Sequence, residues 1–206
     1  MNPIEMFKQE VRENIARLGQ DKPLQGLSNV WIREITRHKY AYNFTWMGRP
    51  IIQFPQDMIA MQEIIWQVRP QVIVEAGIAH GGSLIYYASL LELLGGDGRV
   101  VGVDIDIRAH NRAEIDAHPM RKRIDLVQGS SIDPATADEV RKLAGGRGPA
   151  LVILDSNHTH AHVLEELRLY SPLVKKGSYL VVFDTIIEDM PEDFFTDRPW
   201  GKGDNP

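Results

Sequence analysis

Five short apolar runs recur along the chain at intervals of 24 to 28 residues, and they constrain the fold more than any other feature. Each run is bounded by Gly, Asp or Pro, and stretches with helical character lie between them, as at 83–94, 135–143 and 161–170. Buried strands joined by crossover helices produce this pattern. It predicts an α/β fold with a doubly wound, mostly parallel sheet. The runs are 72–74, 100–103, 124–127, 151–154 and 179–183.

The N-terminal part has a different pattern. Apolar residues at 4, 7, 11, 15 and 18 define one face of a helix that Gly19 ends. Residues 20–54 have no regular period and are rich in aromatics, so we expect an irregular segment, either packed on the core or forming a substrate wall with Phe44 and Trp46. A further helix is predicted to end at Arg69-Pro70. We therefore divide the chain into an N-terminal extension, 1–55, and a sheet domain, 56–206.

Composition narrows the class of protein. The chain has 206 residues, 43% of them hydrophobic and 25% charged, as in an ordinary globular domain. A net charge of −5 without charge blocks disfavours a nucleic-acid partner. The absence of cysteine excludes disulfides and suits the cytoplasm, and no apolar run approaches the ~18 residues of a membrane span. After Phe183 the sequence is polar and Pro-rich, so we expect the native chain to continue past Pro206.

A glycine loop follows the first predicted strand. Ligands of doubly wound sheets bind at the carboxyl ends of the strands. Here Glu75 precedes a G-x-x-x-G-G pattern at Gly77, Gly81 and Gly82, and Ser83 is placed to cap the next helix. This is not the dinucleotide pattern G-x-G-x-x-G. An acid beside such a loop suits a zwitterion, such as the methionine end of S-adenosylmethionine, although a purely structural turn would have the same sequence.

The next two strand ends carry polar residues. Asp104 follows the second run, where an acid typically accepts hydrogen bonds from ribose hydroxyls or caps a helix. Ser130 and Ser131 follow the third run and could contact an adenine edge or form a plain turn. Together with the glycine loop, Asp104 indicates a nucleoside site.

The fourth and fifth strand ends carry acids and histidines. Residues 155–162 contain Asp155, Asn157 and three histidines, and Asp184 follows the fifth run. Histidine is suited to accept a proton near neutral pH, and the oxygens of Asp155 and Asn157 could bind a divalent cation. Asp184 should project into the same cleft, either sharing a metal with Asp155 or orienting a histidine. A transition-metal site made of the histidines is the alternative.

These segments together resemble the cephalosporin hydroxylase / rhamnosyl O-methyltransferase family over residues 28–206. The resemblance implies a Rossmann-like, class I methyltransferase fold and O-methyl transfer from S-adenosylmethionine to a sugar or small-molecule hydroxyl. Nothing resembles the His-x-Asp…His iron site of a non-haem oxygenase. The matching segments are VEAGIAHGGS, VVGVDID, GSSID, LDSNHTHAHVLEEL, VVFDTIIEDMP and YNFTWMGRPIIQFPQD.

The resemblance also assigns roles by position. The methionine part of the cofactor would lie by Glu75 and the glycines of the loop, the ribose by Asp104, and the adenine by Ser130 and Ser131. Related sugar and macrolide O-methyltransferases have a magnesium ligand at the position of Asp155 and a catalytic base at that of His158.

One position departs from the family pattern. Relatives have two adjacent acids at the end of the fifth strand, where this chain has Phe183 and Asp184. Phenylalanine cannot ligate Mg²⁺, so three outcomes stay open: a weaker site, a different ligand set that includes Asn157, or no metal.

We therefore expect an O-methyltransferase with His158 as general base, and Asp155 or Asp184 orienting it or holding Mg²⁺. A non-catalytic nucleoside-binding or assembly protein is the alternative that Phe183 keeps open. An NAD-dependent oxidoreductase is a further alternative, but it would need G-x-G-x-x-G. The apolar faces of the N-terminal extension favour a homo-oligomer.

Overall fold

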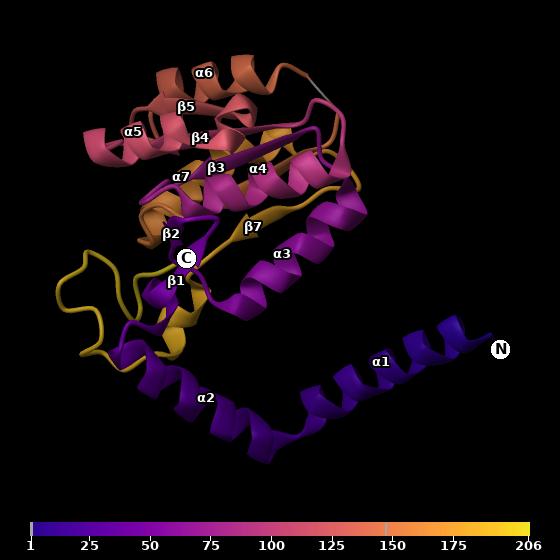
Figure 1. Cartoon of the computed structure of the whole chain (residues 1–206). Helices are drawn as coiled ribbons and strands as arrows, with labels where there is room; N and C mark the ends of the chain where they lie inside the picture. Colours follow the sequence, from indigo (N-terminus) through magenta and orange to yellow (C-terminus); the bar gives the residue numbers. More distant parts are fainter. Residues whose placement is uncertain (1, 147) are drawn as a thin grey trace. The chain divides into compact units, whose positions relative to one another are not determined.

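The computed structural model describes residues 2–146 and 148–206, and it divides into two compact units at Tyr40–Ala41. The first unit holds two helices, α1 (Pro3–Gln20) and α2 (Lys22–Arg37), each with a proline in its first turn (Figure 1). The side chain of Asn2 caps α1, and that of Asp21 accepts a hydrogen bond from Leu24 N at 3.0 Å and caps α2. Neither helix has a buried residue.

The expectation of an irregular segment from residue 20 is therefore wrong over 22–37. The sequence does contain the helix signal. Asp21 is an N-cap residue, Pro23 lies in the first turn, and apolar residues at 24, 27, 30 and 31 have helical spacing. The aromatic content of the longer segment obscured this pattern.

The second unit contains a five-stranded parallel sheet in the order β5-β4-β3-β6-β7, which confirms the predicted fold class. The chain order reverses between β3 and β6, so the switch point, where such sheets bind ligands, lies between their carboxyl ends. The strands are β3 (Val72–Ala76), β4 (Arg99–Asp104), β5 (Ile124–Gln128), β6 (Ala150–Leu154) and β7 (Leu180–Val182).

Helices cover both faces of the sheet (Figure 1). Strands β3 and β6 are buried along their whole length, as central strands of a parallel sheet must be. Successive side chains alternate between two core clusters: Ile73 packs with the helices α3 and α4, whereas Val72 and Val74 pack with α6 and α7. The helices are α3 (Pro55–Val68), α4 (Gly82–Leu94), α5 (Ala109–Ala117), α6 (Pro134–Ala144) and α7 (His160–Tyr170).

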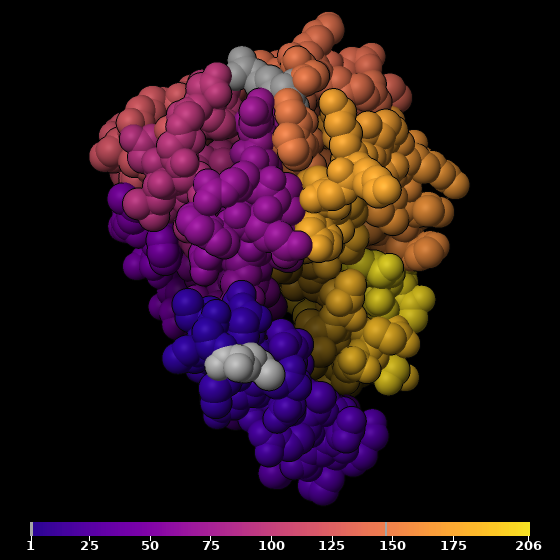
Figure 2. Space-filling model, turned by 90° about the vertical axis from the view of Figure 1, so that its right-hand side faces the viewer, coloured from indigo at the N-terminus to yellow at the C-terminus, as the bar shows by residue number. Residues whose placement is uncertain are grey.

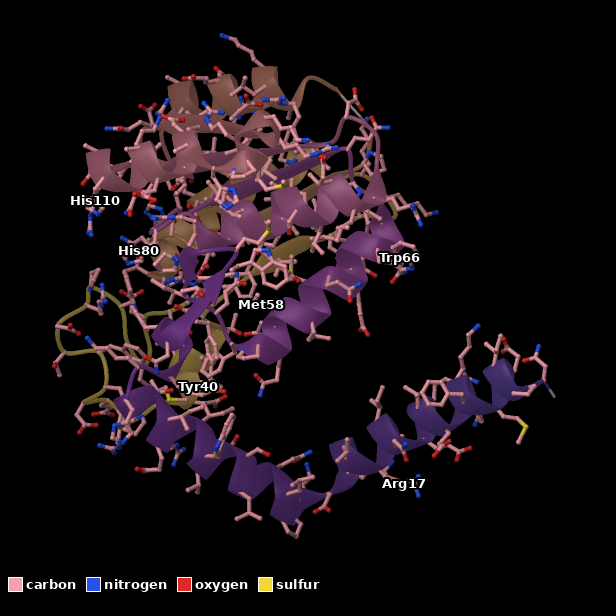
Figure 3. The ribbon with its side chains drawn as sticks, viewed as in Figure 1. Arg17, Tyr40, Met58, Trp66, His80 and His110 are labelled. Carbon is pink, nitrogen blue, oxygen red and sulfur yellow. The ribbon has the colours of Figure 1, made fainter. Side chains whose placement is uncertain are left out.

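Helix α3 ends as the sequence predicts, because Arg69 takes a left-handed conformation directly before Pro70. Figure 2 shows α3, in purple, beside residues of the α7–β7 region, in orange. Trp66 projects outward from α3 (Figure 3), with 59% of its surface exposed and the Arg69 guanidinium 4.4 Å from its ring centroid. No described helix has both the length and the apolar character needed to cross a membrane.

A two-stranded antiparallel hairpin, β1 (Phe44–Trp46) and β2 (Arg49–Ile51), packs against α4. Trp46 donates from Nε1 to Ser89 Oγ at 3.0 Å and meets the ring of Tyr86 edge-on at 4.9 Å. Of the two interpretations of Phe44 and Trp46, these contacts support the packed layer. After β7 comes a short 3₁₀-helix, η4 (Thr185–Asp189), and then irregular chain to Pro206.

Candidate functional site

The glycine loop between β3 and α4 is fixed by the carboxylate at the end of β4. Asp104 accepts hydrogen bonds from Ile78 N at 2.9 Å and Ala79 N at 3.3 Å through one oxygen, and from Asp106 N at 3.0 Å through the other. His80, further along this loop (Figure 3), accepts from Arg49 at 2.6 Å through its carbonyl. The predicted ribose ligand thus already holds the backbone of the predicted methionine-binding loop.

The glycines of this loop are required by close packing. Gly77 has a φ of +98°, and a Cβ there would lie 2.0 Å from the carbonyl oxygen of Asp155. Gly81 also has positive φ, and a Cβ on Gly82 would lie 2.1 Å from the carbonyl oxygen of Pro50. Any side chain at these positions would push the loop away from β6 and the hairpin.

The expectation that Ser83 caps α4 is wrong. The cap is Gly81, which forms no side-chain cap hydrogen bond. Ser83 instead donates from Oγ to Glu75 Oε2 at 2.8 Å, because the two side chains face each other across the turn. The second oxygen of Glu75 has no partner among the described residues, and burial raises the pKa of this carboxyl to about 8.

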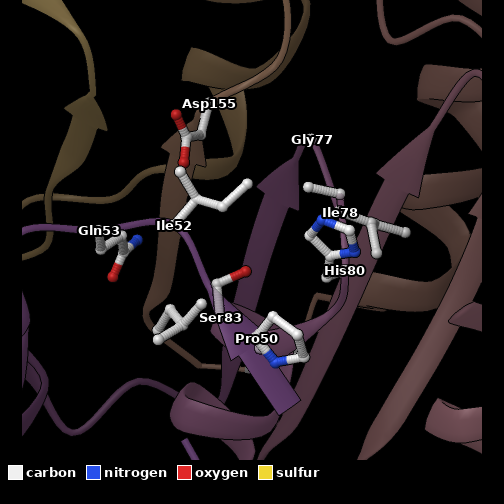
Figure 4. Close-up of a pocket in the computed structure, with 11 residues that line it drawn as sticks. Pro50, Ile52, Gln53, Gly77, Ile78, His80, Ser83 and Asp155 are labelled. Atoms are coloured by element: carbon white, nitrogen blue, oxygen red, sulfur yellow. The ribbon is translucent and has the colours of Figure 1, made fainter. Parts of the chain in front are cut away.

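A small pocket lies beside this loop, lined by residues 50–53, 77–80, 82, 83 and 155 (Figure 4). Gln53 donates from Nε2 to Tyr87 Oη at 3.2 Å, while its buried Oε1 has no partner in the part of the chain that the structure describes. The sequence reasoning did not single out Gln53, although it lies in the RPIIQFP segment of the family resemblance. Gln53, which lines the pocket, and Glu75, which bonds to the lining residue Ser83, thus each have a buried acceptor atom without a partner among the described residues.

Asp155, His158 and Asp184 come together at the ends of β6 and β7. Their ligating atoms all lie within 4.8 Å of one another, and His158 Nε2 lies 3.0 Å from Asp184 Oδ2. The His158 side chain is 8% exposed, that of Asp184 51%. Burial lowers the pKa of His158 from its ordinary value, against the opposing effect of the Asp184 charge, and this lowering favours the neutral imidazole. Burial, then the charge of Asp184, raises the pKa of Asp155 well above 3.8.

The residues around Asp155, His158 and Asp184 bear on whether this group could bind a metal ion. Phe183 packs against the core cluster on the α3–α4 face, so its position contributes an apolar contact. The side-chain oxygen of Asn157 accepts a hydrogen bond from Thr159 N at 3.0 Å, within its own turn. Within the described chain, Asp155, His158 and Asp184 form a group that could hold a metal ion.

The three histidines at 158, 160 and 162, predicted to lie in one loop, do not form one cluster, because α7 begins at His160. His160 is exposed, and its backbone N donates to Asp204 Oδ1 at 2.9 Å. His162 lies among Ser131, Ser156 and Glu166. Among the described residues, the alternative of a histidine-based transition-metal site therefore lacks its ligand set.

The C-terminal segment contributes an aromatic contact that the sequence reasoning missed. Trp200 meets His158 edge-on, with 4.7 Å between ring centroids, and the Arg198 guanidinium lies 5.6 Å from the Trp200 ring. The only available signal was a single tryptophan in an otherwise polar tail. The remaining predicted residues lie after β5: Ser131 is buried and Ser130 half-buried.

A parallel sheet in this order, with a glycine loop after β3 and an acid at the end of β4, defines a Rossmann-like fold of the class I methyltransferase type. The family described as "Rhamnosyl O-methyltransferase/CmcI" matches residues 38–206, and the chain belongs to this family. The resemblance stated from the sequence is thereby confirmed.

Curated relatives include Rhamnosyl O-methyltransferase of Mycobacterium tuberculosis strain H37Rv, 35% identical over 162 residues, or 75% of this chain and 64% of the relative. That of Mycobacterium leprae is 33% identical and covers 75% of this chain and 68% of the relative. The chain thus spans about two thirds of their length.

Solved structures show the same fold. The apo structure of CmcI-N160 is 28% identical, with a TM-score of 0.58 over 70% of this chain and 58% of that one. The structure titled "cmcI-D160 Mg-SAM" is 26% identical, with a TM-score of 0.52 over 70% of this chain and 59% of that one.

Proposed function

We propose that this protein is an S-adenosylmethionine-dependent O-methyltransferase that acts on a hydroxyl of a sugar or small-molecule acceptor. The observation that carries the proposal is a buried histidine, His158, paired with Asp184 beside a pocket lined by Gln53, whose Oε1 has no partner among the described residues. Family membership supports it, and the names of the relatives favour a rhamnose-like sugar.

The residues of the pocket fit the cofactor. The free oxygens of Glu75 and Gln53 could accept hydrogen bonds from an ammonium group beside the Gly77–Ser83 loop. A carboxylate accepts more hydrogen bonds than the three that Asp104 accepts, two from the glycine loop and one from Asp106 N, so it could also bind ribose hydroxyls. Ser130 and Ser131 would face the adenine. When bound, the cofactor supplies a methyl group on a positively charged sulfur.

The protein's own residues would then perform the proton transfer. His158 would take the proton of the acceptor hydroxyl on the ring nitrogen that does not face Asp184, and Asp184 would stabilise the resulting imidazolium. Burial lowers the pKa of His158, which favours the unprotonated imidazole before the reaction. Trp200 restricts the space around this base.

Asp155 and Asp184, with His158, could also hold a divalent cation. Mg²⁺ would lower the pKa of the acceptor hydroxyl and position its oxygen. Phe183, which packs into the core, occupies the position where relatives have an additional acid. The group therefore has only two carboxylates among the described residues, and we expect the metal to bind weakly.

Phe183 also favours a second candidate, a non-catalytic nucleoside-binding protein. Isothermal titration with S-adenosylmethionine, S-adenosylhomocysteine and NAD, with and without Mg²⁺, followed by methyl transfer to simple rhamnosides, separates the candidates. We expect binding of the first two ligands only, and methylation. NAD binding alone would overturn the proposal, and S-adenosylhomocysteine binding without methylation of any glycoside would favour the second candidate.

We further propose that residues 1–55 serve self-association. Helix α1 exposes one apolar face, on which Ile4, Phe7 and Ile15 are each 64–66% exposed. Light scattering at micromolar concentration should show an oligomer, and replacing these three residues by Ser should reduce it to the monomer; a monomeric unmodified chain would contradict the proposal. The cytoplasmic location stays a prediction.

A further inference from the structure

A buried polar cluster lies between the two loops that the proposed function uses for cofactor and catalysis. It consists of Ser131 after β5, Ser156 after β6, and His162 and Glu166 on α7. His162 Nε2 lies 3.0 Å from Ser131 Oγ, 3.2 Å from Ser156 Oγ and 3.3 Å from Glu166 Oε1. Ser156 Oγ donates to Glu166 Oε1 at 2.6 Å.

The proton positions within this cluster follow from the donor inventory. Ser156 Oγ is the donor to Glu166 Oε1, so the Ser156 hydroxyl proton points to this oxygen. Ser156 Oγ must then accept from His162, which places the histidine proton on Nε2. One N–H therefore faces serines from both loops, and the Tyr170 hydroxyl secures the Ser131 side by donating to its carbonyl at 2.9 Å.

Glu166 is costly at this position, because its side chain is fully buried and its Oε2 has no partner among the described residues. An apolar residue would avoid this cost. The preceding residue of the helix shows the contrast: Glu165 is 38% exposed and pairs with Arg168 at the surface. A buried acid with an unsatisfied oxygen calls for a functional explanation.

We propose that Glu166 is a positioning residue which, through Ser156 and His162, couples the loop that carries Ser131 to the loop that carries Asp155 and His158. This rests on the proposed function, in which the first loop lies at the adenine and the second holds the base. Cofactor bound against the Ser131 loop then stabilises the alignment of the base. Ser156 lies two residues before His158, so its displacement moves the base.

The test uses S-adenosylhomocysteine as the probe and the imidazole signals of His158 and His162 in NMR spectra of the whole chain. In the unmodified protein, the probe should shift both signals. In Glu166→Ala and in Ser156→Ala, the probe should still bind within about threefold, but the response of His158 should fall at least about tenfold. Glu166→Gln should restore the response, because its amide oxygen still accepts from Ser156.

Glu165→Ala is the matched control and should behave like the unmodified chain. Circular dichroism checks that each variant folds. If Glu166→Ala does not fold, Ser156→Ala still tests the inference. An unchanged response of His158 in the folded variants, or an equal loss in Glu165→Ala, would overturn the inference alone. Absence of probe binding to the unmodified chain would overturn the proposed function and this inference with it.

Discussion

The two halves of the sheet's carboxyl edge are built differently. On the β3–β4 side, the backbone sets the geometry: Asp104 holds three N–H groups, and Gly77 leaves no room for a side chain. On the β6–β7 side, side chains set it: His158 pairs with the half-exposed Asp184 and contacts Trp200. A rigid backbone suits the binding of a cofactor of fixed shape. The proposed base changes its charge when it gains and loses a proton, so partners whose side chains can move suit it better.

The largest expected effect is a loss of stability caused by a mutation in the glycine loop on the β3–β4 side. Gly77→Ala places a methyl group against the Asp155 backbone at positive φ, and we expect it to lower the free energy of unfolding by more than about 4 kcal/mol. Urea unfolding measures this. The control is Gly48→Ala, which has the same left-handed backbone and nothing within 4 Å, and should lose only about 1 kcal/mol. Equal losses in the two variants would show that the backbone conformation, and not close packing, is the reason why glycine is required at position 77.

A mutation on the β6–β7 side should lower the rate of methyl transfer and leave cofactor binding unchanged. His158→Ala should lower kcat by about 10²–10⁴, the usual value of a general base, while calorimetry shows unchanged affinity for S-adenosylhomocysteine. The exposed His160 offers the control, since His160→Ala removes no contact in the site. Chelation by EDTA should cost less than the His158 mutation. Loss of activity with EDTA, combined with a weak effect of His158→Ala, would show that the site is metal-driven.

The buried acid of the rigid half should make stability depend on pH. The native pKa of Glu75 is about 8, against an ordinary 4.5, so between these values the native chain keeps a proton that the unfolded chain loses. The contribution to stability is complete below pH 4.5 and is lost as pH rises through 8, by roughly 5 kcal/mol. Urea unfolding from pH 5 to 8 should show this slope, and Glu75→Gln should flatten it. The exposed Glu63→Gln should not; a persistent slope in Glu75→Gln would refute the assignment.

The smallest effect should distinguish the two roles of Asp104. Asp104→Ala should weaken S-adenosylhomocysteine binding by about 1–3 kcal/mol, through the loop and the ribose together. Asp104→Asn keeps one acceptor oxygen, which can still serve Ile78 and Ala79, and should lose less. Calorimetry on both variants measures the difference. Unchanged affinity in Asp104→Ala would reject the ribose role.

Much of the fold could be read from the sequence, because parallel strands are continuous apolar runs and their ends must meet at one edge. This is why Asp155, His158 and Asp184 were correctly expected to lie together although 29 residues separate the first and last. Helix α2 was missed because its apolar residues at helical spacing were interpreted together with the aromatic residues at 31–46, as one irregular segment.

The sequence by itself determined the order of elements, the glycine loop and which residues reach the carboxyl edge, since these follow from local periodicity and from the rules of parallel sheets. Tertiary structure alone decided which partner each of these residues has. Glu75 binds Ser83, Asp104 holds the loop backbone, Glu166 braces Ser156, and Trp200 covers His158. A polar side chain has several chemically equivalent partners within reach, and only the packed backbone fixes the distances that choose among them.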